Sequence, residues 1–257
     1  MRKILAIGNS FSEDAAAYLH DIAQQDGVET QVVNLYIGGC SLQQHDENIT
    51  HDARVYRYDL NGSATDRPVS VKEALTEDDW DIVTLQQASH DSGLERTYYP
   101  YIINLSAYIK KYAPAASQMI HETWAYEINS SHEAFQRYDK NQDQMYRSLK
   151  AAYEKAADTL NLAIIPCGEV IQNLRRLPEF DVAAGGRSLC RDGYHMHMIY
   201  GRYAAAATWY ETIFKKNIMK NTYLPPQNDP ANDDEHLFCI IKQTVHDTCT
   251  KQRAIRR

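Results

Sequence analysis

The sequence predicts an α/β fold built around a parallel sheet. Short apolar runs alternate with longer segments of helical periodicity, which is the pattern of successive βαβ units. The runs are mostly apolar throughout, as expected for strands whose two faces are both covered by helices. No Gly/Ser-rich or Pro-rich linker interrupts the middle of the 257-residue chain. We therefore expect one main domain over residues 1–216, with a C-terminal extension over residues 217–257 that packs on it.

Five apolar runs are the expected strands, and we expect them in the spatial order 2-1-3-4-5. Between the second and third runs, Arg54 to Leu60 and Arg67 to Val71 alternate like two further strands. They flank Asn61-Gly62, a pair preferred in the type I′ turns of β-hairpins. The sequence thus predicts a five-stranded parallel sheet with a small hairpin insertion. The five runs are Ile4 to Ile7, Glu29 to Leu35, Asp81 to Leu85, Gln118 to His121 and Leu162 to Pro166.

Helical periodicity marks the segments between the runs. After Pro225-Pro226 the chain leaves this alternation, and one further helix is expected from Glu235 to Lys251. Its apolar stripe, which we expect to pack on the body of the domain, consists of Leu237, Ile240, Ile241, Val245 and Cys249. The earlier helices are expected at Glu13 to Gln25, Leu42 to Ile49, Tyr99 to Tyr112, Phe135 to Leu160, Glu169 to Leu174 and Met198 to Lys216.

The charge balance argues against a polyanionic partner. Lys and Arg number 27 against 34 Asp and Glu, which gives a net charge of -7 at pH 7. We therefore expect no binding to nucleic acid. The five cysteines have no CxxC-type spacing, and their odd number favours reduced thiols over a disulfide framework.

Targeting and membrane signals are not visible in the sequence. No apolar run approaches the ~20 residues of a membrane span. Met1-Arg2-Lys3 leads directly into a strand-like segment, without the apolar region and cleavage site of a signal peptide. We expect a cytoplasmic protein from the sequence as written, and a secreted or periplasmic one if a signal peptide has been removed. The sequence does not indicate the oligomeric state.

The first candidate for chemistry is Gly8-Asn9-Ser10-Phe11-Ser12, between the first strand and the first helix. The carboxyl ends of parallel strands face the ligand crevice in open α/β sheets. A serine at a helix N-terminus lies where unpaired backbone N–H groups can stabilise a developing negative charge. The alternative is that Ser10 or Ser12 is a plain helix N-cap.

The second candidate is Asp192-Gly193-Tyr194-His195, ahead of the Met198 helix. An Asp and a His three residues apart in a turn can meet through the carboxylate and Nδ1. That contact fixes the tautomer and leaves Nε2 free to accept a serine proton. The alternative is a loop histidine with a structural partner.

Together, the two segments resemble the SGNH, or GDSL, hydrolases. The resemblance spans nearly the whole domain: Ile7-Gly8-Asn9-Ser10 is similar to the family's first block, with Asn9 in place of the usual aspartate, and Asp192-Gly193-Tyr194-His195 is similar to its fifth. The following Gly201-Arg202-Tyr203 also resembles that block's tail. The resemblance implies a flavodoxin-like three-layer α/β/α sandwich and an esterase, lipase or carbohydrate deacetylase. Ser10 would be the nucleophile, Asp192 and His195 would complete the triad, and no metal or organic cofactor would be needed.

The resemblance also implies an oxyanion hole. Gly39, in Ile37-Gly38-Gly39-Cys40-Ser41, is the expected backbone donor beside Ser10, although a plain glycine turn is the alternative. The family's Gly-x-Asn-Asp block is missing after the third strand, where the sequence reads Gln86-Gln87-Ala88-Ser89-His90. An ungapped comparison places His90 at the asparagine. We favour Gln86 or Gln87 as the donor, because a neutral amide adds no second titrating imidazole beside His195.

The fourth expected strand ends in His121-Glu122-Thr123-Trp124, and we expect Trp124 to contact the substrate. Eighteen tyrosines and the absence of a lid-like apolar segment favour small acyl esters, above all acetyl groups on carbohydrates. Two other functions stay open: a metal-dependent phosphoesterase and a non-catalytic carbohydrate-binding module. The metal alternative would use Asp192, His195, His197, Glu122 and His121, and the tyrosines expected near the crevice are Tyr56, Tyr58, Tyr98, Tyr99, Tyr101 and Tyr126.

Overall fold

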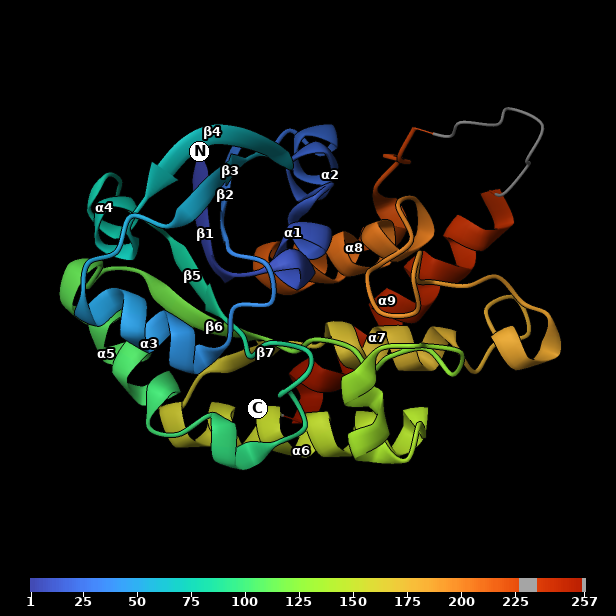
Figure 1. Cartoon of the computed structure of the whole chain (residues 1–257). Helices are drawn as coiled ribbons and strands as arrows, with labels where there is room; N and C mark the ends of the chain where they lie inside the picture. Colours follow the sequence, from blue (N-terminus) through green and yellow to red (C-terminus); the bar gives the residue numbers. More distant parts are fainter. Residues whose placement is uncertain (227–234, 256–257) are drawn as a thin grey trace.

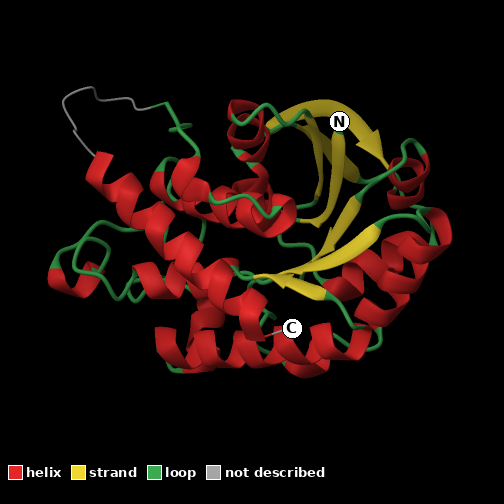
Figure 2. Ribbon diagram, turned by 180° about the vertical axis from the view of Figure 1, so that it is seen from behind, coloured by secondary structure: helices red, strands yellow, loops and turns green. Residues whose placement is uncertain are grey.

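The computed structural model describes residues 1–226 and 235–255, and its centre is a mostly parallel sheet (Figures 1 and 2). Within the described residues the sheet has seven strands in the order β4-β3-β2-β1-β5-β6-β7. Ile4 and Leu5 of the central strand are fully buried, as expected for a strand covered on both faces. The strands are β1 (Arg2–Gly8), β2 (Thr30–Tyr36), β3 (Tyr56–Leu60), β4 (Ser63–Val69), β5 (Ile82–Leu85), β6 (Ser117–His121) and β7 (Ala163–Ile165).

The parallel part of the sheet, β2-β1-β5-β6-β7, has the predicted order 2-1-3-4-5. The predicted count of five strands is wrong, because the hairpin does not stand apart from the sheet. Strand β3 pairs antiparallel with β2, and β4 pairs with β3, so the hairpin extends the sheet at that edge. Asn61 and Gly62 both have positive φ, 49° and 79°, as a type I′ turn requires.

Helices cover both faces of the sheet (Figure 1). One face carries α3, α5 and α6, and the other carries α1, α2 and α8. The short helix α4, packed against α3 and α5, was not predicted. The helices are α1 (Ser10–Ala16), α2 (Leu19–Gln25), α3 (Leu42–Thr50), α4 (Val71–Thr76), α5 (Tyr101–Tyr112), α6 (Gln142–Leu160), α7 (Cys167–Leu174), α8 (Tyr200–Phe214) and α9 (Glu235–Ile255), with short 3₁₀ turns at η1 (Glu95–Thr97), η2 (Glu133–Tyr138), η3 (Val182–Ala184) and η4 (Ile218–Lys220).

Two predicted helices are each divided in the structure. The segment from Glu13 to Gln25 forms α1 and α2, and the hairpin turn packs against the break, where Gly62 approaches the carbonyl oxygen of Ala17. The segment from Phe135 to Leu160 is divided because Asp139 and Lys140 adopt positive φ. Asn141 then caps the start of α6 by accepting a hydrogen bond from the backbone N–H of Gln144.

The C-terminal helix α9 packs on α8 and α7. Leu237, Ile241, Val245 and Cys249 of the predicted stripe are buried, and Ile240 is half-buried. These side chains belong to the same hydrophobic cluster as the central strands. None of the helices within residues 1–226 and 235–255 combines the length and apolar character needed to cross a membrane.

The hairpin turn gives a test of how tightly it packs on the α1–α2 break. A Cβ on Gly62 would lie 2.3 Å from the carbonyl oxygen of Ala17, whereas a Cβ on Gly27, whose φ is also positive at 70°, would meet nothing within 4 Å. Both alanine variants adopt a strained left-handed backbone, but only Gly62→Ala adds a steric clash. We expect Gly62→Ala to lower the free energy of unfolding by about 1–3 kcal/mol more than Gly27→Ala, measured by urea denaturation. Equal losses would show that the turn does not press on Ala17.

Candidate active site

Ser10 is the first residue of α1, directly after its N-cap Asn9, which follows the last residue of β1. The side chain of Asn9 accepts a hydrogen bond from the backbone N–H of Phe11 at 2.9 Å. The same side chain donates to the carbonyl oxygen of Cys40 at 3.1 Å. The turn that presents Ser10 is therefore fixed at its own helix start and to the loop that follows β2.

The structure brings the three predicted triad residues together in one hydrogen-bonded line. The distance from Ser10 Oγ to His195 Nε2 is 2.9 Å, and the distance from His195 Nδ1 to Asp192 Oδ2 is 2.7 Å. Because a carboxylate accepts hydrogen bonds, Nδ1 carries the proton and Nε2 is left to accept the proton of Ser10.

The other carboxylate oxygen of Asp192 accepts hydrogen bonds from the backbone N–H groups of His195 at 2.8 Å and Tyr194 at 3.1 Å. Burial raises the pKa of Asp192, but these bonds and the one from the His195 side chain outweigh it and lower the pKa below its ordinary value. A carboxylate with a lowered pKa keeps these contacts at neutral pH and loses them only as the pH falls through the lowered pKa.

The loop from Leu189 to His197 that carries the pair is folded tightly on itself. The backbone N–H of Arg191 donates to the carbonyl oxygen of His195 at 2.9 Å, and that of His197 donates to Leu189 at 2.7 Å. At the tip, Gly193 has a φ of 87°, and a Cβ there would lie 2.8 Å from Cα of Ser130. The glycine between Asp192 and His195 is therefore required by both backbone conformation and space.

Ser12, the other serine of the first candidate segment, has a different role. Its side chain is buried, and its Oγ lies 2.6 Å from Asn34 Oδ1 and 2.9 Å from the carbonyl oxygen of Asn9. It also accepts a hydrogen bond from the backbone N–H of Asn9 at 3.0 Å. These bonds make Ser12 part of the capping box of α1, whereas the hydroxyl of Ser10 faces the imidazole.

The two glutamines expected as oxyanion donors are buried and have other partners. Gln87 Nε2 donates to the carbonyl oxygen of Thr97 at 2.9 Å, and its Oε1 accepts from the backbone N–H of Leu42 at 2.9 Å. Gln86 Nε2 donates to Asn9 Oδ1 at 2.8 Å. Contrary to the sequence-based expectation, both amides hold the loops in place. His90, the ungapped alternative, is half-exposed.

Trp124 also differs from its predicted role. Its side chain is fully buried, its ring stacks on Phe11 with centroids 4.5 Å apart, and its Nε1 donates to the carbonyl oxygen of Tyr194 at 2.7 Å. A covered indole offers no surface to a substrate. Trp124 therefore supports the turn that carries His195, and the expectation of substrate contact is wrong for this structure.

Asp14, which the sequence analysis did not single out, joins the nucleophile helix to the triad loop. It lies one turn after Ser10, is fully buried, and accepts hydrogen bonds from the backbone N–H of Met196 and Nε of Arg202, both at 2.8 Å. Arg191 Nη1 contacts both of its oxygens at 3.0 and 3.1 Å. Asp14 could have been found from its position in the sequence, because it lies on the same face of α1 as the apolar Phe11, where a buried carboxylate needs partners.

Glu127 is a second anchor that the sequence analysis missed. Its backbone N–H donates to the carbonyl oxygen of Gly193 at 2.8 Å. Its buried carboxylate accepts hydrogen bonds from the Ser188 hydroxyl and from the backbone N–H of Leu189, and lies 3.7 Å from the guanidinium of Arg175. Asp14 and Glu127 thus hold the triad loop from two sides.

Aromatic rings accompany the triad, and one of the expected tyrosines is among them: Tyr126 packs on Tyr194 with centroids 5.6 Å apart and on His132 at 4.7 Å. Tyr194 lies against His195 with centroids 4.3 Å apart, and His132 meets Tyr194 edge to face at 4.9 Å. Both rings are half-buried. Burial lowers the pKa of His132, and the nearby charges of His90 and His195 lower it further. The expected tyrosines that are buried are Tyr56, Tyr58, Tyr98 and Tyr126.

The five residues of the metal-site alternative do not converge. His195 is held by Asp192 and Ser10, and His121 Nδ1 lies 2.8 Å from Gln86 Oε1. Glu122 is fully buried, and burial raises its pKa to about 8. Across residues 1–226 and 235–255, no cluster of three or more His, Cys, Asp or Glu side chains has a metal-binding arrangement.

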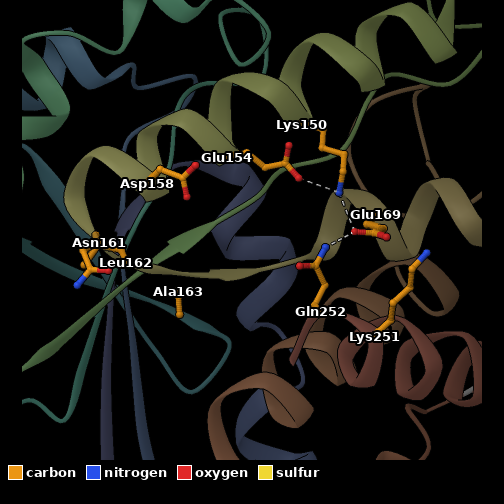
Figure 3. A pocket seen from close by; sticks show the side chains of 9 residues that line it. All are labelled: Lys150, Glu154, Asp158, Asn161, Leu162, Ala163, Glu169, Lys251 and Gln252. Atoms are coloured by element: carbon orange, nitrogen blue, oxygen red, sulfur yellow. Dashed lines mark hydrogen bonds and ion pairs between the residues drawn. The ribbon is translucent and has the colours of Figure 1, made fainter. Parts of the chain in front are cut away.

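A cavity of about 710 Å³ lies away from the triad, between α6, α7 and α9 (Figure 3). Lys150 projects into it and pairs with Glu169 at 2.9 Å and with Glu154 at 3.3 Å. Gln252 of α9 donates a further hydrogen bond to Glu169. Three of the charged side chains of this cavity, Lys150, Glu154 and Glu169, therefore pair with one another, and none of its lining residues belongs to the triad.

The fold is that of the SGNH and GDSL-like hydrolases. A lipase/acylhydrolase from Enterococcus faecalis has a TM-score of 0.52 at 18% identity, covering 89% of this chain and 100% of that chain. A candidate SGNH hydrolase from Slackia heliotrinireducens has a TM-score of 0.55 at 20% identity, covering 82% of this chain and 98% of that chain. At these identities the likeness establishes the shared fold and the mostly parallel sheet flanked by helices.

Residues 3–235 match DUF4886, a domain of unknown function, so the chain belongs to this family. A DUF4886 family protein from Bacteroides uniformis ATCC 8492 has a crystal structure with a TM-score of 0.87 at 37% identity, covering 96% of this chain and 94% of that chain. The sequence matches none of the curated proteins with which it was compared.

The anchor between α1 and the triad loop can be tested through stability. Asp14→Ala leaves two guanidinium groups and the N–H of Met196 without their buried acceptor, and should lower the free energy of unfolding by about 3 kcal/mol. Glu13→Ala is the matched control, because it removes a half-buried partner of Arg57 and should cost under about 1 kcal/mol. Urea denaturation measures both, and equal losses would contradict the anchoring role of Asp14.

Proposed function

We propose that this protein is a serine esterase that removes small acyl groups, acetyl above all, from carbohydrate esters. The observation that carries the proposal is the line of hydrogen bonds from Ser10 to His195 to Asp192, with distances of 2.9 and 2.7 Å. A serine at a strand end and helix start, facing an imidazole that a carboxylate orients, is the arrangement of an activated nucleophile. The shared SGNH fold supports the same class of reaction.

In the acylation step, Ser10 Oγ attacks the ester carbonyl carbon while His195 Nε2 takes the hydroxyl proton. Asp192 stabilises the imidazolium that forms. The tetrahedral intermediate then collapses: the bond between the carbonyl carbon and the alcohol oxygen breaks, and His195 returns its proton to the leaving alcohol. The acyl group is now bound to Ser10 as an ester.

In the deacylation step, water attacks the same carbonyl carbon, and His195 again takes a proton. Collapse of the second intermediate breaks the bond between the carbonyl carbon and Ser10 Oγ. Ser10 takes a proton from His195, and the carboxylic acid is released. In both steps the negative oxygen would be held by the backbone N–H groups of Ser10, in the first turn of α1, and of Gly39, in the loop fixed by Asn9.

The residues around the triad favour a short acyl group and a ring-shaped alcohol. Phe11 and Trp124 are buried against each other, and Phe11 also lies 5.9 Å from the imidazole of His195, so side chains already fill this space. Tyr194 is a half-buried ring next to His195, and the half-buried ring of His132 packs on Tyr194. Aromatic faces of this kind pack well on the apolar faces of sugar rings.

The assignment of the nucleophile predicts different effects for the two neighbouring serines. Ser10→Ala should lower kcat on a chromogenic acetate ester by about 10⁴-fold or more, with the free energy of unfolding unchanged. Ser12→Ala removes buried hydrogen bonds to Asn9 and Asn34, and should lower the free energy of unfolding by about 1–3 kcal/mol with a far smaller effect on kcat. The assignment is wrong if Ser10→Ala keeps its activity while Ser12→Ala loses it.

The substrate assignment predicts a preference for short acyl chains. Acetate esters, including an O-acetylated sugar, should be hydrolysed with a higher kcat/KM than the matching octanoate esters, because buried side chains already occupy the space beside His195. The comparison is made with nitrophenyl acetate and octanoate and with the corresponding sugar esters. Preference for octanoate would contradict the small acyl group, and cleavage of nitrophenyl acetate without any cleavage of sugar acetates would contradict the carbohydrate.

A further inference from the structure

Two fixed backbone groups define the orientation of the Asn9 side chain. Its Oδ1 accepts from the N–H of Phe11, and its Nδ2 donates to the carbonyl oxygen of Cys40. A backbone N–H can only donate and a carbonyl can only accept, so the amide cannot be flipped without breaking both bonds. The side chain thereby links the turn that carries Ser10 to the loop that carries Gly39.

The donor and acceptor roles of the next two side chains, Gln86 and His121, follow in the same way. Because Asn9 Oδ1 can only accept, Gln86 must donate to it through Nε2, at 2.8 Å. The Oε1 of Gln86 is then left to accept a hydrogen bond from His121 Nδ1, also at 2.8 Å. His121 must therefore carry its proton on Nδ1. Every bond in this series runs in one direction, from His121 to Gln86 to Asn9 to the carbonyl of Cys40.

This series, which we call the Asn9 relay, crosses the carboxyl ends of four adjacent strands. His121 is the last residue of β6, Gln86 follows β5, Asn9 follows β1, and Cys40 lies in the loop after β2. All four residues are at most 2% exposed, so water does not compete for these bonds. Burial lowers the pKa of His121 to about 3, which keeps its imidazole neutral.

We propose that the Asn9 relay is a positioning device that fixes the Gly39 loop relative to Ser10, and so sets the geometry of the oxyanion site. The inference rests on the proposed esterase function. The proposal also explains why position 9 is asparagine in this chain, whereas the first block of the SGNH hydrolases that it resembles has aspartate. An ionised aspartate at this position could not donate to Cys40, and would place its negative oxygen against that carbonyl in a buried setting.

Substitution of Asn9 tests this role through the chemical step. Asn9→Asp should lower kcat on nitrophenyl acetate by about 100-fold with little change in KM, because oxyanion contacts tighten only in the transition state. A protonated aspartic acid can still donate to Cys40, whereas the ionised form cannot. The kcat of Asn9→Asp should therefore decline as the pH rises, over a range in which the wild-type kcat stays level. A merely structural loss would not add this alkaline decline.

Two substitutions of His121 provide a matched pair at the far end of the relay. In His121→Asn, the side-chain amide nitrogen can take the place of Nδ1 and donate to Gln86, whereas His121→Leu has no donor. We expect His121→Asn to keep kcat close to the wild-type value, and His121→Leu to lose about tenfold. Thermal denaturation of both variants separates this effect from any loss of folded protein.

Hydrogen exchange supplies a measurement that does not depend on activity. Backbone N–H groups in the peptide that contains Gly38 to Ser41 should exchange faster in Asn9→Asp than in the wild type, while those of β7 stay unchanged. Wild-type kcat and exchange in Asn9→Asp would overturn the relay and leave the esterase proposal standing. A wild-type protein that hydrolyses no ester would overturn the proposed function, and unchanged exchange in Asn9→Asp would then overturn the relay as well.

Discussion

The hydrogen bond between Ser10 and His195 is the contact on which the site depends, since it joins two segments that are 185 residues apart in the chain. Neither segment has a chemical role alone. The serine needs a base, and the histidine needs both a proton to accept and a carboxylate to orient it. The parallel sheet makes the meeting possible, because β1 ends at the turn before Ser10 and the triad loop precedes α8, which packs on α1.

Two buried carboxylates hold the parts of the site at their working distance. Asp14 ties the helix of Ser10 to the residue that follows His195, and Glu127 holds the other side of the same loop. Both are surrounded by donors that would otherwise be unpaired in the interior, so removing either carboxylate disturbs the loop itself. The indole of Trp124 adds a third support by donating to Tyr194. The geometry of the proposed triad thus depends on residues that take no part in the proposed reaction.

The sequence predicted the parallel strands because buried strands leave a local signal, the short apolar run. The triad was predicted only when two distant segments were taken together, because their combined resemblance to the SGNH hydrolases implied roles for Ser10, Asp192 and His195 that neither segment implied alone. The sequence did not predict that the hairpin joins the sheet, because the pairing of β3 with the edge of β2 depends on tertiary contacts and not on local sequence pattern. Gln86, Gln87 and Trp124 were placed at the correct strand ends but given the wrong partners. The position of a residue after a strand determines where its backbone lies, but not which way its side chain is oriented. The orientations of Gln86, Gln87 and Trp124 are set by hydrogen bonds to Asn9, Thr97 and the carbonyl oxygen of Tyr194.

The nucleophile can be identified directly by finding the residue that a serine-directed phosphonate modifies. We predict one adduct per chain, on Ser10, with loss of ester hydrolysis in proportion to labelling, and no adduct in Ser10→Ala. Peptide mass spectrometry distinguishes Ser10 from Ser12 within the same segment. An adduct on Ser12 or on any residue outside the triad, with Ser10 unmodified, would show that Ser10 is not the nucleophile.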